Sequence, residues 1–364
     1  MAQKKYIISG GGTGGHIFPA IAIANELKLS NPDCDILFVG AEGRMEMEKV
    51  PQNGYKIVGL PIAGFQRGSI VKNISLPFKL LNSLYKAFKV LKSFKPTAVI
   101  GVGGYASGPL LKAANLLNIP TFIQEQNSYA GVTNKLLSQK AKQIFVAYDS
   151  MGQFFPANKL VLTGNPVRQD LIDLGSKRLE GYSYYQLNPN LKTIVVMGGS
   201  LGAKTMNEAM ENSFELIKSK PDVQILWQVG KLYKEKFSNC ETAKLPNVHL
   251  FEFLQKMDFA YAVADVVVAR AGALTISEVC VAGLPTILVP SPHVAEDHQT
   301  KNAESLSKVH AAILVKDDLA KNTLLETAIK LIDNEQERNS LKQEILKLAK
   351  PNATKEIVEH ISKI

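Results

Sequence analysis

Three glycine-rich segments are the first places in this sequence where side chains and backbone could do chemistry. Each follows an apolar stretch; they are Gly10–Gly15, Gly103–Gly108 and Gly198–Gly202. A glycine loop between a parallel strand and a helix places bare backbone N–H groups near an anion, and the helix dipole adds partial positive charge there. One such loop can equally be a tight turn that needs positive φ. Three of them favour phosphate-bearing ligands at the carboxyl ends of the sheets.

A fourth segment offers a nucleotide site of a different kind. Residues Asp265–Gly272 have the pattern of a strand followed by a loop, and Ala273–Glu278 opens a helix. Thr275 and Ser277 offer hydroxyls near the start of that helix. The carboxylate of Glu278 can accept both ribose hydroxyls of a nucleotide lying across the helix start. The alternative is that this acid simply favours its position near a helix N-terminus.

Two common nucleotide-binding classes are disfavoured by the same residues. A dinucleotide oxidoreductase needs an acid at the end of its second strand to hold the ribose, but that stretch ends Phe38-Val39-Gly40-Ala41, with Glu42 beyond it. No Gly-Lys-Ser or Gly-Lys-Thr occurs, so a Walker loop is absent. No Asp-x-Asp pair lies at a strand end, which favours a site that holds a diphosphate with amides and arginine and uses neither metal nor cofactor.

The overall composition indicates a globular protein with more than one domain. Of 364 residues, 46% are hydrophobic and 21% charged, a balance that supports an ordinary core. The three cysteines, Cys34, Cys240 and Cys280, are odd in number and far apart, which excludes a disulfide framework and a cysteine zinc site. No apolar run reaches the ~18 residues of a membrane span. The start of the chain reaches the glycine run Gly10–Gly15 too soon after Met1 to be a signal peptide. We therefore expect a soluble, cytoplasmic-type protein unless it binds a membrane from outside.

The elements that must position these loops alternate between strand and helix in two halves. Such alternation predicts parallel sheets covered on both faces. Gly164-Asn165-Pro166-Val167 has the composition of a linker between the halves. Expected helices are 19–29, 203–218 and a C-terminal stretch of about 324–364 that Pro351 divides into two. Expected strands are 5–9, 35–40, 98–102, 121–124, 143–147, 193–197, 223–229, 248–251, 266–269 and 286–289.

Positive charge is concentrated in the first half of the chain. Residues 1–165 hold 18 basic and 8 acidic residues, a net of +10, whereas residues 166–364 hold 24 and 25. No Asp or Glu occurs between Glu48 and Glu125, an interval with ten Lys and Arg residues. One face of the first half should therefore attract an anionic partner, which is nucleic acid, anionic lipid or a phosphorylated substrate.

A basic amphipathic segment lies inside this acid-free interval. Ile74, Phe78, Leu81, Leu84, Tyr85, Phe88 and Leu91 recur at helical spacing, with Lys72, Lys79, Lys86, Lys89 and Lys92 beside them. An ordinary surface helix, with its stripe in the core, is one interpretation. Contact with an anionic membrane is the other. Nucleic acid is disfavoured because no recognised binding motif accompanies the charge.

Six segments together resemble the MurG family of bacterial peptidoglycan glycosyltransferases. They occur in that family's order and approximate spacing, from about Tyr6 to Ala303: Gly11–His16, Gly103–Gly108, Glu125–Asn127, Gly164–Arg168, Gly198–Ala203 and Gly272–Glu278. The resemblance implies a GT-B fold, with two Rossmann-like, doubly wound parallel-sheet domains facing a cleft. It implies an N-terminal acceptor and membrane domain at 1–164, a UDP-sugar donor domain at 165–345, and a last helix, about 346–364, that packs back on the first domain.

The resemblance also implies an activity. A member of this family moves N-acetylglucosamine from UDP-N-acetylglucosamine to the C4 hydroxyl of the N-acetylmuramoyl sugar of undecaprenyl-diphosphate-linked lipid I. The configuration inverts, and the product is lipid II for peptidoglycan synthesis, and so for cell shape and division. A related UDP-sugar transferase acting on another lipid acceptor is the alternative, and a nucleotide-sugar-binding scaffold without turnover is a third. The family location is the cytoplasmic face of the plasma (inner) membrane, as a peripheral protein with cell-wall and division proteins as candidate partners.

The family's site residues carry over to matching positions of this sequence. Donor contacts fall on Thr13, Gly14, Gly15, Asn127, Arg168, Ser200, Leu254, Ala273, Leu274, Thr275, Ile276, Ser277, Glu278 and Gln299. The acceptor diphosphate falls on Gly103, Gly104, Tyr105 and Ser107. The membrane contact is expected from the amphipathic segment itself, at Lys72, Ile74, Phe78, Lys79, Leu81, Tyr85, Lys86, Phe88 and Lys89, and a lipid-linked acceptor favours it. In such enzymes the Leu254 position offers backbone to uracil, the Glu278 position holds the ribose, Ser200 and Arg168 resemble diphosphate contacts, and Asn127 and Gln299 resemble sugar contacts.

Two features depart from the family pattern, and one role stays open. The third loop has Leu201 where glutamine is usual, and the stretch before Gln299 is longer and differently charged. Inversion requires a base for the acceptor hydroxyl. His16 is the first candidate because it follows the first loop and imidazole titrates near neutrality; positioning the acceptor diphosphate or capping the helix are its alternatives. Glu125 is the second candidate, or instead orients His16.

Overall fold

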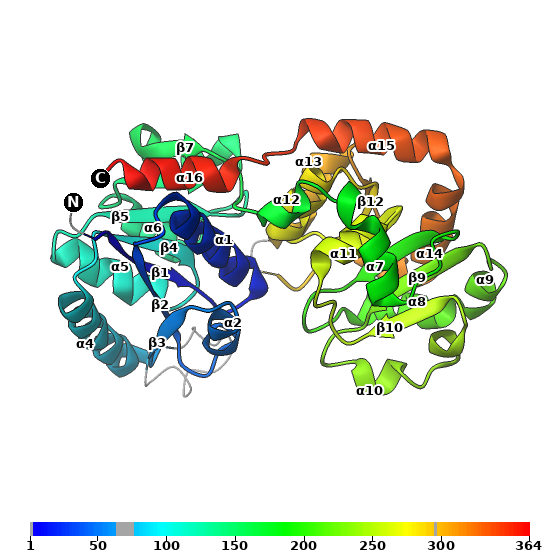
Figure 1. The fold of residues 1–364 in the computed structure, drawn as a ribbon, viewed down its shortest axis with the longest axis horizontal. Helices are drawn as coiled ribbons and strands as arrows, with labels where there is room; N and C mark the ends of the chain where they lie inside the picture. The colour runs from blue at the N-terminus through cyan, green and yellow to red at the C-terminus, as the bar shows by residue number, and fades with distance from the viewer. Residues whose placement is uncertain (1–2, 63–75, 295–296) are drawn as a thin grey trace. The chain divides into compact units, whose positions relative to one another are not determined.

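A computed structural model describes residues 3–62, 76–294 and 297–364. The chain forms two compact units, Met1–Arg168 with Asn352–Ile364, and Gln169–Pro351 (Figure 1). We call them unit 1 and unit 2. The division falls after Arg168 rather than Gly164, and the return to unit 1 begins at Asn352 rather than near residue 346. The reason is local: Val167 is buried, and its carbonyl accepts a hydrogen bond from the Thr354 hydroxyl at 3.0 Å.

Unit 1 is built on one parallel sheet in the order β3-β2-β1-β4-β5-β6-β7. Its strands are β1 Lys5–Gly10, β2 Asp35–Ala41, β3 Lys56–Leu60, β4 Ala98–Gly103, β5 Thr121–Glu125, β6 Gln143–Val146 and β7 Leu160–Leu162. Successive side chains of a strand face opposite sides, so β1 sends Ile8 to one core and Ile7 to another. Both faces of the sheet are therefore covered.

Helices from distant parts of the chain provide that cover. The helices are α1 Gly14–Ser30, α2 Glu46–Gln52, α4 Leu76–Phe94, α5 Ser107–Leu116, α6 Val132–Ser138 and α16 Ala353–Ser362, with 3-10 turns η1 Asp149–Gln153 and η2 Ala157–Lys159. α1 and the last helix, α16, share the Ile8 face, and α4, α5 and α6 share the Ile7 face (Figure 1). The C-terminal segment thus completes the core of unit 1.

Unit 2 repeats the design with a parallel sheet in the order β10-β9-β8-β11-β12-β13. Its strands are β8 Lys192–Met197, β9 Val223–Gln228, β10 Val248–Phe251, β11 Val266–Arg270, β12 Thr286–Val289 and β13 Ile313–Leu314. Its helices are α7 Arg178–Tyr185, α8 Lys204–Asn212, α9 Phe214–Lys218, α10 Lys234–Phe237, α11 Met257–Val263, α12 Ala273–Ala282, α13 His298–Ser307, α14 Asp317–Asp333 and α15 Glu335–Lys347, with 3-10 turns η3 Gln169–Leu171, η4 Gly175–Lys177 and η5 Glu241–Lys244.

Three expected helices have wrong bounds. The first begins at Gly14, not Pro19, because the glycine loop itself turns into the helix. The expected helix 203–218 breaks at Ser213 into α8 and α9. The C-terminal stretch forms three helices rather than two, since Asn334 caps α15 by accepting the Glu337 N–H at 3.0 Å. Asn334 with Glu337 three residues on is a capping pattern that the sequence does contain.

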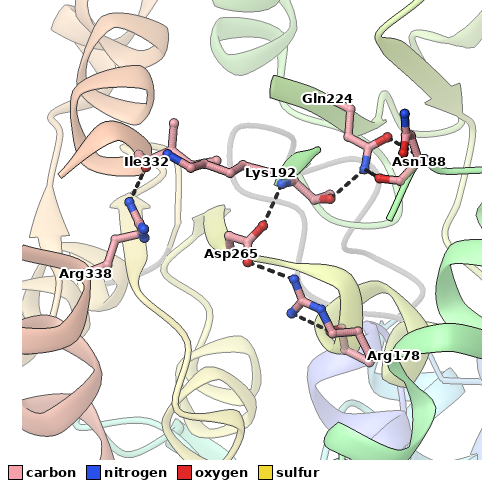
Figure 2. A network of polar contacts seen from close by, with 9 residues as sticks. Arg178, Asn188, Lys192, Gln224, Asp265, Ile332 and Arg338 are labelled. Atoms are coloured by element: carbon pink, nitrogen blue, oxygen red, sulfur yellow. Dashed lines mark hydrogen bonds and ion pairs between the residues drawn. The ribbon is translucent and has the colours of Figure 1, made fainter. Parts of the chain in front are cut away.

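A polar network fixes the amino-terminal end of the unit 2 sheet (Figure 2). Asp265, just before β11, accepts the Thr193 N–H at 2.8 Å and pairs with Arg178 at 2.9 Å. Gln224 in β9 donates to the Thr193 hydroxyl and to the Asn188 carbonyl, both at 2.9 Å. These contacts connect the amino-terminal ends of β8, β9 and β11, at the end of the sheet opposite to the glycine loop, so they stabilise the fold.

None of the helices among the described residues is long and apolar enough to cross a membrane.

Candidate functional site

The first two glycine loops touch each other in unit 1. β1 and β4 are neighbours, with Gly10 opposite Gly103 at their ends. Gly104 has φ +91°, and a Cβ added there would lie 2.5 Å from the Gly11 carbonyl oxygen. A side chain at this position would collide with backbone, so the close approach of the loops requires glycine. The two loops thus form one continuous backbone surface.

His16 lies against this surface, near the start of α1. Its Nδ1 is 3.0 Å from the Gly11 carbonyl oxygen. A Cβ added to Gly103 would lie 2.6 Å from the imidazole Cδ2, so the ring packs directly on the second loop. A carbonyl only accepts hydrogen bonds, so Nδ1 carries the proton in the neutral ring. Nε2 is then the nitrogen that can take up a proton.

Glu46 is a functional candidate that the sequence analysis missed. It begins α2, is only 1% exposed, and its carboxylate accepts the Gly12 N–H at 2.8 Å and the Ala41 N–H at 3.0 Å. The acid that the sequence lacks at the tip of β2 therefore occurs just beyond it, where it supports the first glycine loop. No spacing rule distinguishes Glu46 from Glu42 or Glu48, so only the fold reveals it.

Residues predicted to hold the acceptor diphosphate divide into accessible and buried ones. Gly103 and Gly104 are half-buried, and Tyr105 is exposed with the Arg44 guanidinium 6.0 Å from its ring centroid. Ser107 is buried, and its hydroxyl lies 3.1 Å from the Ser9 carbonyl and 2.9 Å from the Gly103 carbonyl. Ser107 therefore supports the second loop from inside.

Glu125 organises the loop that carries Asn127. It is buried at the end of β5, and its two oxygens accept hydrogen bonds from three residues. Oε1 accepts from the Asn127 N–H at 3.2 Å and from its side-chain amide at 3.4 Å. Oε2 accepts from the Gly131 N–H and the Asn134 amide, both at 2.9 Å. Thr13 is exposed at the N-cap of α1, and Gly14, Gly15, Asn127 and Arg168 are half-buried.

The third glycine loop lies in unit 2, after β8. Gly199 has φ +87°, the same value as Gly12 in the first loop. Gly202 has φ +88°, and a Cβ added there would lie 2.1 Å from the Val229 carbonyl oxygen, so the loop packs backbone to backbone on the turn after β9. Ser200 is half-buried, and Leu201, the departure from the family pattern, is exposed.

α12 follows β11 as expected, with Gly272 as its N-cap. Ala273, Leu274, Thr275 and Ile276 form its first turn; Thr275 is half-buried, and the Ser277 hydroxyl donates to the Ala273 carbonyl at 3.0 Å. Glu278 is buried, and its Oε2 accepts the Tyr261 hydroxyl of α11 at 3.0 Å. Burial raises the pKa of the neighbouring Cys280 thiol to about 12, so that thiol stays protonated at neutral pH and is not a nucleophile.

Gln228 connects this loop to the Leu254 backbone. Its side-chain amide donates to the Gly199 carbonyl at 3.0 Å, and its Oε1 accepts the Leu254 N–H at 2.9 Å. Gln299, in α13, is half-buried and accepts the Ser291 N–H at 2.8 Å. Unit 2 thus places Ser200, the fully buried Leu254 and the start of α12 at the carboxyl ends of β8, β10 and β11. Among the residues that the structure describes, no three His, Cys, Asp or Glu side chains are grouped as metal ligands would be.

The predicted amphipathic segment forms α4, with an exposed apolar stripe. Phe78 is 75% exposed, Leu81 66% and Tyr85 60%, whereas Ser83, Ala87 and Leu91 are buried. The interpretation that places the stripe in the core is therefore wrong for its first half. Lys86 pairs with Glu42 at 2.8 Å, and Lys89 lies 4.7 Å from the Tyr85 ring centroid. Lys79 is exposed and Phe88 half-buried. The predicted contacts Lys72 and Ile74 lie outside the described residues.

Two Rossmann-like units, each with a glycine loop after its first strand, define the GT-B class of glycosyltransferases. A solved glycosyltransferase of kitacinnamycin has this fold, with a TM-score of 0.74 at 15% identity over 100% of this chain and 99% of that one. The model of the glycosyltransferase family 28 N-terminal domain matches residues 6–146, and that of its C-terminal domain matches residues 193–361. The chain belongs to glycosyltransferase family 28 and, within it, to the MurG family.

Relatives over the full length support that membership. A Bacteroides fragilis protein named UDP-N-acetylglucosamine--N-acetylmuramyl-(pentapeptide) pyrophosphoryl-undecaprenol N-acetylglucosamine transferase is 52% identical over 362 residues, 99% of this chain and 95% of that protein. A Flavobacterium psychrophilum protein of the same name is 51% identical over 100% of this chain and 98% of its own. The crystal structure of Acinetobacter baumannii MurG has a TM-score of 0.75 at 31% identity, over 99% of this chain and 100% of that one. The resemblance and the fold class predicted from sequence are confirmed.

Proposed function

We propose that this protein is an inverting hexosyltransferase that moves N-acetylglucosamine from UDP-N-acetylglucosamine to the C4 hydroxyl of lipid I and makes lipid II for peptidoglycan synthesis. The observation that carries the proposal is the 52% identity to a transferase of that name over 99% of this chain. The geometry supports it because unit 2 offers a nucleotide site and unit 1 offers a base beside a glycine surface.

The donor is held mainly by unit 2 in this proposal. Glu278 accepts the ribose hydroxyls, and the bond from Tyr261 supports this role because it holds one carboxylate oxygen in place. The third loop and the first turn of α12 direct backbone N–H groups at the diphosphate, with Ser200 and Arg168 as further contacts. These preorganised donors stabilise the charge that develops on the departing UDP, the task that contributes most to such catalysis. Neither metal nor cofactor enters the proposal.

His16 is the general base for the acceptor hydroxyl. Its Nδ1 hydrogen bond to the Gly11 carbonyl fixes the ring and the tautomer. Nε2 is then the nitrogen that receives the proton as the C4 oxygen attacks the anomeric carbon and UDP leaves.

Glu125 is assigned a supporting role in place of a catalytic one. It holds the loop that presents Asn127, since both of its oxygens already accept hydrogen bonds. Asn127 and Gln299 contact the sugar, Thr13, Gly14 and Gly15 complete the donor contacts, and Gly103, Gly104 and Tyr105 hold the acceptor diphosphate.

α4 brings the protein to its lipid-borne substrate. Phe78, Leu81 and Tyr85 expose apolar surface that can enter the headgroup region, and each nearby lysine contributes about 1 kcal/mol at an anionic surface. We propose peripheral attachment at the cytoplasmic face of the plasma membrane. Anionic liposomes should sediment the protein at low salt and release it at high salt. Equal binding to neutral liposomes at any salt contradicts this part of the proposal.

A transfer assay tests the activity itself. The protein is incubated with UDP-N-acetylglucosamine, labelled in the sugar, and with lipid I and a diacylglycerol as competing acceptors, and the lipid fraction is analysed. The proposal predicts labelled lipid II. Label in a different lipid only, such as a diacylglycerol, would identify a related transferase, and UDP-sugar binding without any labelled lipid would identify a scaffold; both results reject the proposed reaction.

A further inference from the structure

We propose that Gln228 is a positioning residue that couples the diphosphate loop to the base-binding backbone of the donor site. The inference rests on the proposed function, since it concerns how unit 2 recognises UDP. Gln228 is the last residue of β9, is 3% exposed, and makes hydrogen bonds from both ends of its amide. Its NH₂ group donates to the Gly199 carbonyl in the third loop, and its Oε1 accepts from the Leu254 N–H.

The hydrogen bond to Gly199 sets the direction of a neighbouring donor. A trans peptide is planar, with its C=O and N–H on opposite sides, so the Gly199 carbonyl and the Ser200 N–H belong to one rigid group. The Gln228 side-chain amide and the Gly202 N–H both donate to that carbonyl at 3.0 Å, and together they aim the Ser200 N–H away from the sheet. Gly199 has φ +87°, and glycine can also adopt many other backbone conformations. A hydrogen bond from outside the loop therefore restricts the conformations of this residue.

The hydrogen bond to Leu254 acts on the other end of the nucleotide. Because Oε1 of Gln228 occupies the Leu254 N–H at 2.9 Å, the peptide between Phe253 and Leu254 has a fixed plane. With its N–H occupied by Gln228, Leu254 has its carbonyl, in the following peptide group, as the backbone group that we assign to N3–H of a uracil. One buried side chain therefore fixes both the element that meets the diphosphate and the element that meets the base.

The chemistry of the side chain explains why it is glutamine. An uncharged amide offers a donor at one end and an acceptor at the other, as Gly199 and Leu254 require. Gln228→Glu keeps the acceptor for Leu254 but turns an oxygen toward the Gly199 carbonyl. Gln228→Ala removes both hydrogen bonds. The two variants thus separate the loop contact from the whole bridge.

Gln224 supplies a matched control on the same strand. It is 1% exposed and also makes hydrogen bonds from both ends of its amide, to Asn188 and Thr193, but at the opposite edge of the sheet (Figure 2). Gln224→Ala therefore removes the same kind of buried amide without touching the third loop or Leu254. Trp227, the single tryptophan, is buried beside Gln228 and reports folding by fluorescence in every variant.

The test is calorimetric titration of the full-length wild type and the three variants with UDP and with uridine, together with thermal unfolding and steady-state kinetics. We expect Gln228→Ala and Gln228→Glu to weaken UDP binding about 10- to 100-fold, the effect of losing hydrogen bonds that position an ionic contact. Uridine binding should weaken less in Gln228→Glu, so the ratio of UDP to uridine affinity falls. The KM for the UDP-sugar should rise while the KM for lipid I stays constant.

Gln224→Ala should lower the unfolding temperature at least as much as Gln228→Ala and leave UDP affinity within about threefold of the wild type. Wild-type UDP affinity in a folded Gln228→Glu protein overturns the inference, as does an equal loss of UDP affinity in Gln224→Ala. A folded wild-type protein that does not bind UDP overturns the proposed function as well, and this result is distinct because it precedes any comparison of variants.

Discussion

The first and third glycine loops occupy equivalent places in the two units, yet their supports differ in charge. Each follows the first strand of its sheet, and Gly12 and Gly199 share a φ of +87°. Under the first loop lies the carboxylate of Glu46, which accepts a hydrogen bond from the Gly12 N–H. Under the third loop lies the neutral amide of Gln228, which instead donates a hydrogen bond to the Gly199 carbonyl. A buried negative charge repels an anion, whereas a held carbonyl directs the next N–H outward.

The difference teaches that glycine content does not decide what a loop holds. All three loops are expected from sequence to face phosphate, but the side chain beneath each one sets the sign of its surroundings. We infer that the third loop suits the UDP diphosphate, while the first loop suits His16 and an uncharged hydroxyl. The comparison predicts that variants at His16 and Glu46 mainly alter turnover, whereas variants at Gln228 and Glu278 mainly alter UDP affinity.

The largest expected effect is that of His16→Ala. Loss of the base should lower kcat by about 10²- to 10⁴-fold and leave UDP affinity unchanged, since the imidazole acts on the acceptor hydroxyl. Steady-state kinetics at saturating substrates, with calorimetric UDP titration beside them, measure both quantities. Unchanged kcat would remove His16 from the chemistry, and a large loss of UDP affinity would remove the distinction between the loops.

Glu278→Gln should have the next largest effect, and it should fall on binding. The variant keeps the shape of the side chain but removes the charge that accepts the ribose hydroxyls, so UDP should bind about 10- to 100-fold more weakly. Glu304→Gln is the control, because Glu304 is a partly exposed acid of α13 paired with Lys308. If the two variants bind UDP equally well, the ribose lies elsewhere.

Glu46→Gln tests the support of the first loop. The amide keeps one acceptor but turns an N–H toward a backbone N–H, so we expect kcat to fall about tenfold with UDP affinity unchanged. Glu42→Gln is the matched control, because Glu42 is an exposed neighbour whose ion pair with Lys86 contributes little. A variant at Glu46 that weakens UDP binding as strongly as one at Gln228 would mean that both loops hold the UDP diphosphate.

The smallest effect should come from Leu201→Gln, which restores the residue usual in the family. The Leu201 side chain is exposed, and the loop conformation depends on glycines and on Gln228 rather than on this side chain. UDP affinity should therefore change by less than about threefold, within the usual range of surface substitutions. A larger gain in affinity would show that the third loop is incomplete in this protein.

Much of the fold could be predicted from sequence because the signals are local. Apolar runs ending in glycine marked β1, β4 and β8, and Gly272 marked the start of α12. The supports Glu46 and Gln228 could not be predicted, since each acts on residues brought near it only by the sheet. The periodicity of α4 gave its helical stripe correctly, but periodicity does not say what covers a face, and Phe78 and Leu81 turn out to be exposed.

A crystal of the protein soaked with UDP tests the central claim most directly. We predict density for the ribose at Glu278, for the uracil at the Leu254 backbone, and for the diphosphate at Ser200 and the start of α12. Diphosphate density on the first loop, against the Gly12 N–H that donates to Glu46, would contradict the division of roles between the two loops.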